Sequence, residues 1–252
     1  MNSRLSVEVI YRVAGIYHYW RRILRLYTNY VLLKKFPGRW VDHGFLFIHI
    51  PKTAGSSIRS VLIEAAGGTD VRPRLWHPPA HIWKAALGTP RYNKLFKFAI
   101  VRHPVSRLFS GFNYLMNRRP LPWLASYIQI KGWSFEEFVM EWLVPSRKRT
   151  RFAFFDLFWP QTWFITSWKK TSPIIVAYVG RVESLDRDWL TIRHHLKQIS
   201  GLSLPETLPH RNVGSYERTA LKNIDRLVLE RIALFYEEDY TLLGYDPFDV
   251  II

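Results

Sequence analysis

The clearest hydrophobic pattern in the chain is a set of three short, continuous runs of apolar residues. They span Phe45–Ile50, Phe96–Val101 and Pro173–Gly180. A short run with few polar interruptions is typical of a strand that is buried on both faces. We therefore expect these three segments to be strands of one central sheet.

The segments between these runs show the three-to-four-residue spacing of helices. In the first of them, Ile58, Val61 and Leu62 fall on one face. The expected helices cover residues 56–66, 80–87, 135–143, 185–199 and 220–235, and one more begins at Pro104. Strands that alternate with helices indicate an α/β fold, with helices on both sides of a mostly parallel sheet in three layers.

The first forty residues form a separate pattern, that of a long, basic, amphipathic helix. Arg21, Arg22 and Arg25 lie off its apolar stripe, and Pro37 and Gly38 end it. The stripe consists of Val9, Val13, Ile16, Tyr17, Trp20, Leu24, Tyr27 and Val31. Such a helix packs on its own domain or on a second subunit of a homo-oligomer, or it lies on an anionic membrane surface. We expect this helix over residues 1–40 and a single domain over residues 41–252.

The charge of the chain is strongly positive. Its 252 residues include 36 Lys and Arg against 20 Asp and Glu, so the formal net charge is +16. A field of this sign attracts nucleic acid, anionic lipid, phosphorylated cofactors and acidic polysaccharides without choosing among them. The absence of cysteine excludes disulfides, a thiolate nucleophile and a cysteine-based zinc site.

The sequence also bears on location. The first residues lack the basic segment followed by an apolar one that marks a secretory signal. No apolar run reaches the roughly 18 residues of a membrane-spanning helix. We therefore expect a cytoplasmic protein, placed at the inner face of the membrane if the N-terminal helix binds lipid.

The strongest chemical signal is the junction HIPKTAGSS, residues 49–57, between the first strand and the first helix. A helix N-terminus offers unpaired backbone N–H groups to an anion, Gly55 allows close backbone approach, and Lys52, Ser56 and Ser57 add a charge and two hydroxyls. The loop is not a Walker A loop, in which the lysine follows the second glycine. The alternative is an ordinary strand-to-helix turn capped by Ser56.

A second anion-binding pattern follows the second strand. Arg102 stands at the end of that strand, and the next helix carries Arg107 and Ser110. An arginine beside a hydroxyl at a strand end suits a phosphate group. The alternative is that Arg102 pairs with a carboxylate and Ser110 lies on the helix surface.

Together, the two segments resemble the cofactor-binding motifs of sulfotransferases that use 3′-phosphoadenosine 5′-phosphosulfate (PAPS), in the branch of carbohydrate sulfotransferases and their bacterial relatives. This resemblance implies a P-loop-like fold, PAPS as donor, no metal, and a carbohydrate or glycolipid acceptor. The first segment resembles the 5′-phosphosulfate loop and the second the 3′-phosphate motif, with His103 where relatives often have Asn or Asp. The implied cofactor-binding residues are Lys52, Thr53, Ala54, Gly55, Ser56, Ser57, Arg102 and Ser110.

A general base is the remaining catalytic requirement, because the acceptor hydroxyl must lose its proton. Histidine suits this task, since its ordinary pKa lies near neutrality. The resemblance favours His77, eleven residues before Gly88, as the base beside Lys52 as the second catalytic residue. His81 and a carboxylate, Glu64 or Asp70, are the alternatives.

The remaining candidates concern the ligand pocket. Asn212 and Ser215 match weaker echoes of the family and are candidates for lining the nucleotide pocket, whereas Glu183 opens a helix and is expected to be structural. A set of basic and aromatic residues has two equally good explanations, an acceptor groove or a solvated basic face over an aromatic core. The set consists of Arg118, Arg119, Trp123, Trp133, Arg147, Lys148, Arg149, Trp159 and Trp163.

Two other classes of function compete with a sulfotransferase. A nucleotide kinase or related phosphotransferase is disfavoured because the lysine is misplaced and no magnesium-binding carboxylate follows a strand. The case for a non-enzymatic binder of acidic polymers depends on the net charge alone, and the basic residues form no recognisable nucleic-acid-binding motif. We therefore expect an enzyme that does not bind nucleic acid.

Overall fold

The computed structural model describes residues 23–24, 26–36, 38–67, 77–117, 132–143, 156–167, 172–209, 221 and 223–250. Within these ranges a three-stranded parallel sheet runs in the order β1 (Phe45–Ile48), β2 (Phe96–Val101) and β3 (Tyr178–Arg181). The register pairs Phe47 with Phe98 and Ile100 with Gly180. The expected α/β fold with its parallel sheet is confirmed.

Strand β1 is apolar throughout because both of its faces are buried. Phe45 and Phe47 of β1 contribute to one hydrophobic cluster, whereas Leu46 and Ile48 contribute to the other. Alternate side chains of a strand point to opposite faces, so a strand between two cores needs apolar residues at every position.

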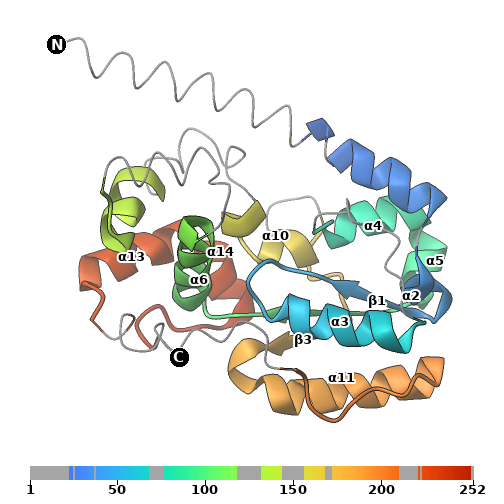
Figure 1. The fold of residues 1–252 in the computed structure, drawn as a ribbon. Helices are drawn as coiled ribbons and strands as arrows, with labels where there is room; N and C mark the ends of the chain where they lie inside the picture. The colour runs from blue at the N-terminus through green and yellow to red at the C-terminus, as the bar shows by residue number, and fades with distance from the viewer. Residues whose placement is uncertain are drawn as a thin grey trace.

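Helices cover the two faces in separate layers. The first cluster joins the sheet to α3 (Gly55–Ala65) and α11 (Leu185–Ser200). The second joins it to α4 (Ala80–Leu87), α6 (Pro104–Asn117), α10 (Thr162–Ile165), α13 (Arg226–Phe235) and α14 (Glu237–Leu243). Figure 1 shows α3 and α11 together on one side of the strands, with α4 and α10 on the other.

Short elements connect these layers. They are α2 (Arg39–Asp42), α5 (Thr89–Lys94), α8 (Phe135–Glu137) with the π-helical turn η1 (Phe138–Leu143), and the 3₁₀ turns η2 (Asp156–Phe158) and η3 (Val182–Ser184). The helix expected over 135–143 is therefore only partly α-helical. The short helices α2, α5, α10 and α14 have too few turns to show a periodic pattern and were not expected from the sequence.

Three expected boundaries differ from the structure by two residues or more. β1 ends at Ile48, two residues before the expected end. The third strand begins at Tyr178, because Ile174 forms an isolated antiparallel bridge with Thr166 instead. The helix expected from residue 220 begins at Arg226 as α13, where the carboxylate of Asp225 accepts a hydrogen bond from the N–H of Leu227 and caps the helix.

The helix expected in the first forty residues is described over 23–24 and 26–35. Its buried face is formed by Asn29 and Leu33, which are 2% and 0% exposed. Leu24 and Tyr27, which belong to the stripe expected from the sequence, are each 64% exposed. In its described part, the stripe therefore does not pack on the domain, because the opposite face makes that contact.

Candidate active site

The loop between β1 and α3 has a backbone that few residues adopt. Lys52 and Ala54 have φ angles of 68° and 59°, in the left-handed region that is unfavourable for residues with a side chain. The hydroxyl of Thr53 donates to the carbonyl of Ile50 at 2.9 Å and closes the turn. Strain of this kind persists only where surrounding contacts impose it, and it concentrates at functional sites.

The N-terminus of α3 carries no negative charge of its own. No side chain caps it, and its first turn has no acidic residue. The N–H groups of Ser57 and Ile58 bond to the carbonyl of Ala54, so the helix begins with Gly55 and exposed Ser56 at its tip. The positive end of the helix dipole is thus left for an external anion.

Gly55 is required by the packing of a neighbouring imidazole. A Cβ at this position would lie 2.0 Å from two atoms of the His49 ring. That ring stacks on Phe47 with centroids 5.6 Å apart, and its other neighbour is the ring of His77, in edge contact at 4.6 Å. The glycine therefore allows His49 and His77 to lie against the junction between β1 and α3, residues 49–57, which is called the phosphate loop below.

His77 is the candidate base that lies beside this loop. It is partly buried, and its φ of 42° again lies in the left-handed region. His81, on α4, instead makes an edge contact with Trp163 at 5.1 Å. Glu64 is exposed near the C-terminal end of α3, away from the loop, and Asp70 lies outside the described residues.

Arg102 is held through its backbone by Gln161, which lies 59 positions further along the chain. The side chain of Gln161 accepts a hydrogen bond from the Arg102 N–H at 2.8 Å and donates one to the Arg102 carbonyl at 2.7 Å. Because these bonds use the main chain, they fix the strand end without involving the guanidinium. Ser110, on α6, is 8% exposed.

Gln161 is itself anchored by a buried carboxylate, Asp239 of α14. The backbone N–H groups of Gln161 and Thr162 donate to it at 2.8 and 2.9 Å, and the Thr162 hydroxyl donates at 2.9 Å. The Asp239 side chain is fully buried, so these bonds provide the stabilisation that water would otherwise supply. Nothing in the local sequence around Asp239 indicated this role.

Arg107 supports the loop and does not extend the phosphate site. It is 1% exposed, and its guanidinium donates to the carbonyls of Pro51, Trp159 and Leu157 at 3.0, 2.8 and 3.2 Å. The bond to Pro51 ties α6 to the residue directly before Lys52. Arg107 therefore has a structural role, because its guanidinium is bonded to main-chain oxygens.

One further aromatic residue reaches the loop. The ammonium of Lys52 lies 4.5 Å from the centroid of the Tyr114 ring, and Tyr114 is 46% exposed on α6. The two residues are 62 positions apart, so the contact leaves no signal in the sequence.

The junction between β2 and α6 contains a buried histidine, His103. The backbone N–H of His103 donates to Glu183 at 2.6 Å, and the Tyr245 hydroxyl donates to the same carboxylate at 3.0 Å. Glu183 is thus structural, as expected. The Nε2 of His103 lies 2.8 Å from the carbonyl of Asp246, and burial lowers the pKa of this histidine.

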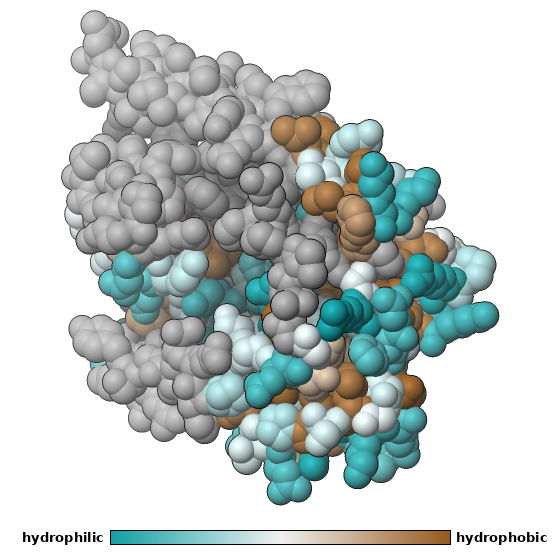
Figure 2. All heavy atoms as spheres, turned by 45° about the vertical axis from the view of Figure 1, so that its right-hand side comes forward, coloured by the Kyte–Doolittle hydropathy of each residue, from teal (hydrophilic) through white to brown (hydrophobic). Residues whose placement is uncertain are grey.

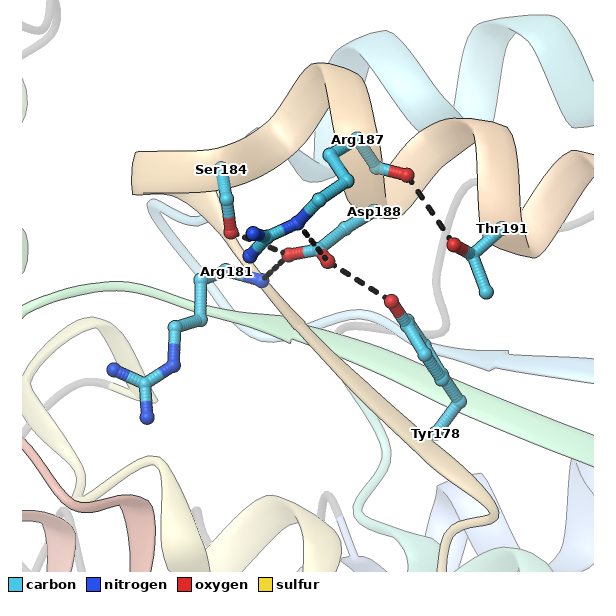
Figure 3. Close-up of polar contacts among 6 residues, drawn as sticks. All are labelled: Tyr178, Arg181, Ser184, Arg187, Asp188 and Thr191. Atoms are coloured by element: carbon cyan, nitrogen blue, oxygen red, sulfur yellow. Dashed lines mark hydrogen bonds and ion pairs between the residues drawn. The ribbon is translucent and has the colours of Figure 1, made fainter.

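The junction between β3 and α11 is organised around an internal carboxylate, Asp188, which is 7% exposed. Figure 3 shows the hydroxyls of Tyr178 and Ser184 and the backbone N–H of Arg181 directed at it, at 2.9, 2.7 and 2.7 Å. A Cβ at Gly180 would lie 3.0 Å from the Cβ of Asp188, so helix and strand approach closely here.

The remaining candidates are only partly described. Trp159 is buried in the core in edge contact with Trp163 at 4.5 Å, and Trp133 is partly buried. The basic residues expected in an acceptor groove, together with Trp123, Asn212 and Ser215, lie outside the described residues. Among the residues that are described, no group of three or more His, Asp or Glu side chains is placed to bind a metal ion.

Comparisons with known proteins agree with this geometry. A profile of the sulfotransferase family matches residues 41–246. The chain is 25% identical to carbohydrate sulfotransferase 12 of Mus musculus over 248 residues, covering 81% of this chain and 58% of that protein. It is 26% identical to carbohydrate sulfotransferase 10 of Rattus norvegicus, covering 83% of this chain and 67% of that protein. The chain thus spans little more than half of the first relative, and no solved structure matches it significantly.

Proposed function

The chain belongs to the sulfotransferase family, and on this premise we propose that it transfers a sulfuryl group from PAPS to a hydroxyl of a carbohydrate or glycolipid. The observation that supports the proposal is a pair of strand-to-helix junctions, with Lys52 after β1 and Arg102 after β2, at the carboxyl ends of strands that are neighbours in the sheet. Ligands of open parallel sheets bind at this edge. Two sites there suit a donor with phosphate groups at its 5′ and 3′ positions.

The residues of the two junctions have distinct roles in this proposal. Lys52 and the backbone N–H groups of residues 53–57 hold the 5′-phosphate, and Arg102 with Ser110 holds the 3′-phosphate. The acceptor oxygen attacks sulfur while the bond from sulfur to the 5′-phosphate oxygen breaks. The products are a sulfate ester and 3′,5′-ADP. Lys52 neutralises the negative charge that develops on the leaving phosphate, which is the main electrostatic demand of such a transfer.

His77 is the proposed general base, which accepts the proton of the acceptor hydroxyl as the new bond forms. Its position in edge contact with His49, which itself lies against Gly55, supports this role. His81 is a weaker candidate because its ring lies against Trp163. No step of this scheme needs a metal ion.

The nature of the acceptor is proposed from the relatives. Both are named carbohydrate sulfotransferases. Trp163, partly buried beside His81, is an aromatic surface of the kind on which sugars stack. These observations favour a carbohydrate or glycolipid over a small phenol.

For location, we propose the cytoplasm, with contact to the inner face of the membrane. The stripe residues Leu24 and Tyr27 are each 64% exposed, and the exposed Lys34 and Lys35 follow on the same helix. On the face drawn in Figure 2, hydrophobic side chains at the upper edge lie beside strongly hydrophilic ones. An apolar stripe flanked by lysines suits an anionic lipid surface. No helix in the described part of the chain is long and apolar enough to cross a bilayer.

Co-sedimentation with vesicles tests the membrane contact. The chain should sediment with phosphatidylglycerol vesicles and much less with phosphatidylcholine vesicles, and Leu24→Ser with Tyr27→Ser should reduce the difference. Equal sedimentation with both lipids would contradict the proposal. A dimer in light scattering that the same substitutions dissociate would show instead that a second copy covers the stripe.

Calorimetric titration tests the donor site directly. Without metal, 3′,5′-ADP should bind tightly and 5′-AMP and ATP weakly, because only the first has both phosphates at the correct positions. Arg102→Gln should weaken 3′,5′-ADP binding far more than 5′-AMP binding. Arg91→Gln, which removes an exposed arginine paired with Asp42, is the matched control and should change neither.

Other outcomes would favour the competing functions. Binding of ATP that requires magnesium would favour a phosphotransferase. Absent binding of all three nucleotides, with retained binding of an acidic polysaccharide, would favour a non-enzymatic binder. Tight binding of 3′,5′-ADP alone would justify a screen of carbohydrate acceptors with labelled PAPS.

A further inference from the structure

One face of α6 meets the phosphate loop at successive turns. Arg107, Ser110 and Tyr114 are spaced by three and four residues, so they lie along the same side of the helix. The first of them donates to the carbonyl of Pro51. The last lies under the ammonium of Lys52. The helix therefore contacts both the main chain of the loop and its lysine side chain.

The contact between Lys52 and Tyr114 has the geometry of a cation–π interaction. The ammonium is 4.5 Å from the ring centroid, within the range of about 6 Å over which the ring face attracts a cation. Lys52 is partly buried, whereas Tyr114 is 46% exposed, so the ring is not needed to fill the core. The cation that lies over the face of the Tyr114 ring is the ammonium of Lys52.

A lysine that must meet a phosphate benefits from such a support. Its four-carbon side chain has many rotamers, and their restriction on binding opposes the interaction. Lys52 also lies in a left-handed turn, which fixes the direction in which its side chain leaves the loop. A ring beside that path reduces the number of positions the ammonium explores before the anion arrives.

We propose that Tyr114 is a positioning residue that holds the Lys52 ammonium at the phosphate loop ready for the 5′-phosphate. The inference rests on the proposed function, because it assumes that Lys52 binds that phosphate. The interaction uses the face of the ring, so the Tyr114 hydroxyl is not required for it.

Calorimetric binding of 3′,5′-ADP tests the inference without knowledge of the acceptor. Tyr114→Leu should weaken binding by about 3- to 30-fold, because the rotamers of Lys52 that the ring restricts beforehand must then be restricted on binding. Tyr114→Phe keeps the ring face and should bind like the wild type. In a Lys52→Met background, Tyr114→Leu should have no further effect, because the cation is gone. A purely structural tyrosine would give the same loss in both backgrounds.

The chain offers a matched control in Phe248, a ring that is 50% exposed and lies 4.9 Å from the guanidinium of Arg226. Phe248→Leu removes a comparable contact and should leave binding unchanged. Melting temperatures of all variants check that the fold is retained.

The outcomes separate the two proposals. If Lys52→Met weakens the binding of 3′,5′-ADP and Tyr114→Leu leaves it unchanged, the role of Tyr114 alone is overturned. An equal loss for Tyr114→Leu with and without Lys52 would overturn it as well. Absent binding of 3′,5′-ADP to the wild type would overturn the proposed function and this inference together.

Discussion

Two strand-to-helix junctions of the same parallel sheet handle the positive end of a helix in opposite ways. At the β3–α11 junction, the first turn of the helix supplies its own carboxylate, and Asp188 accepts hydrogen bonds from Tyr178, Arg181 and Ser184. At the β1–α3 junction the first turn of the helix has no acidic residue, and the loop before it carries Lys52 instead. The first junction has an internal carboxylate, whereas the second has none and is the one proposed to receive an anion.

The two junctions also differ in their backbone conformation. Among the described residues other than glycine, a positive φ occurs at Lys52, Ala54 and His77, which all lie in or beside the β1–α3 loop, and at none of the residues around Asp188. Each junction also needs a glycine for close packing, against Asp188 at Gly180 and against His49 at Gly55. Close packing alone therefore does not distinguish the junction that is proposed to bind the donor. The combination of strained backbone and missing internal anion does.

The largest effect is expected from removal of the charge that distinguishes the loop. Lys52→Ala should lower kcat by about 10²- to 10³-fold, the usual loss when one preorganised donor to the developing charge is deleted. Steady-state transfer from labelled PAPS to an acceptor found in the screen measures it, with a thermal melt to show that the fold is retained. Lys94→Ala, an exposed lysine at the end of α5, is the control. Wild-type turnover in Lys52→Ala would mean that the loop is not the donor site.

A second substitution makes the β1–α3 junction resemble its counterpart. Ser56→Asp places a carboxylate at the exposed N-terminus of α3, where it should stabilise the fold by about 0.3–1 kcal/mol. The same charge repels a phosphate, so affinity for 3′,5′-ADP should fall by about 10- to 100-fold. Calorimetry measures the expected loss of affinity, and thermal melting measures the expected gain of stability. Ser56→Asn is the neutral control, and unchanged affinity in Ser56→Asp would separate the helix terminus from the ligand.

The converse substitution removes the internal anion from the β3–α11 junction. Asp188→Asn turns one acceptor of the network into a donor that faces other donors, which should cost about 1–3 kcal/mol of unfolding free energy. For a chain of this size, each kcal/mol lowers the melting temperature by about 2–4 °C. Affinity for 3′,5′-ADP should stay at the wild-type value. If binding fell in parallel with stability, the two junctions would not be functionally distinct.

The sequence predicted the sheet and the helices nearest to it because their signals are local. β2 and α4 have the bounds expected from the sequence, since an unbroken apolar run marks the strand, and Pro79 and Gly88 flank the helix. The residues of the phosphate loop lie close together because they are consecutive in the chain. Their proposed roles came from the resemblance and stay predictions until binding is measured.

The supports of the site could not be predicted because they join distant segments. Gln161 reaches Arg102 across 59 positions, and Asp239 reaches Gln161 across 78. Arg107 illustrates the difficulty most clearly. Nothing in the local sequence distinguishes Arg107 from Arg102, yet burial against three carbonyls makes Arg107 a structural residue. Residue type and spacing do not reveal which partners a buried side chain meets.

The smallest effect concerns the β2–α6 junction, where His103 allows a test by pH. Its Nε2–H donates to the carbonyl of Asp246, so its Nδ1 carries the lone pair, and this atom is buried with no hydrogen-bond partner in the described part of the chain. Burial therefore lowers the pKa of His103, and the folded state binds its proton less readily than the unfolded state. Stability should be fully present above the unfolded pKa of about 6.5 and decline as the pH falls through the folded value.

Melting curves between pH 7.5 and pH 5 measure the decline, and His103→Asn should flatten it because Asn does not titrate there. An equal decline in that variant would assign the pH dependence to other groups. A steeper loss of 3′,5′-ADP affinity than of stability would place His103 in the functional junction, against the structural role that its bonds to Glu183 and Asp246 indicate.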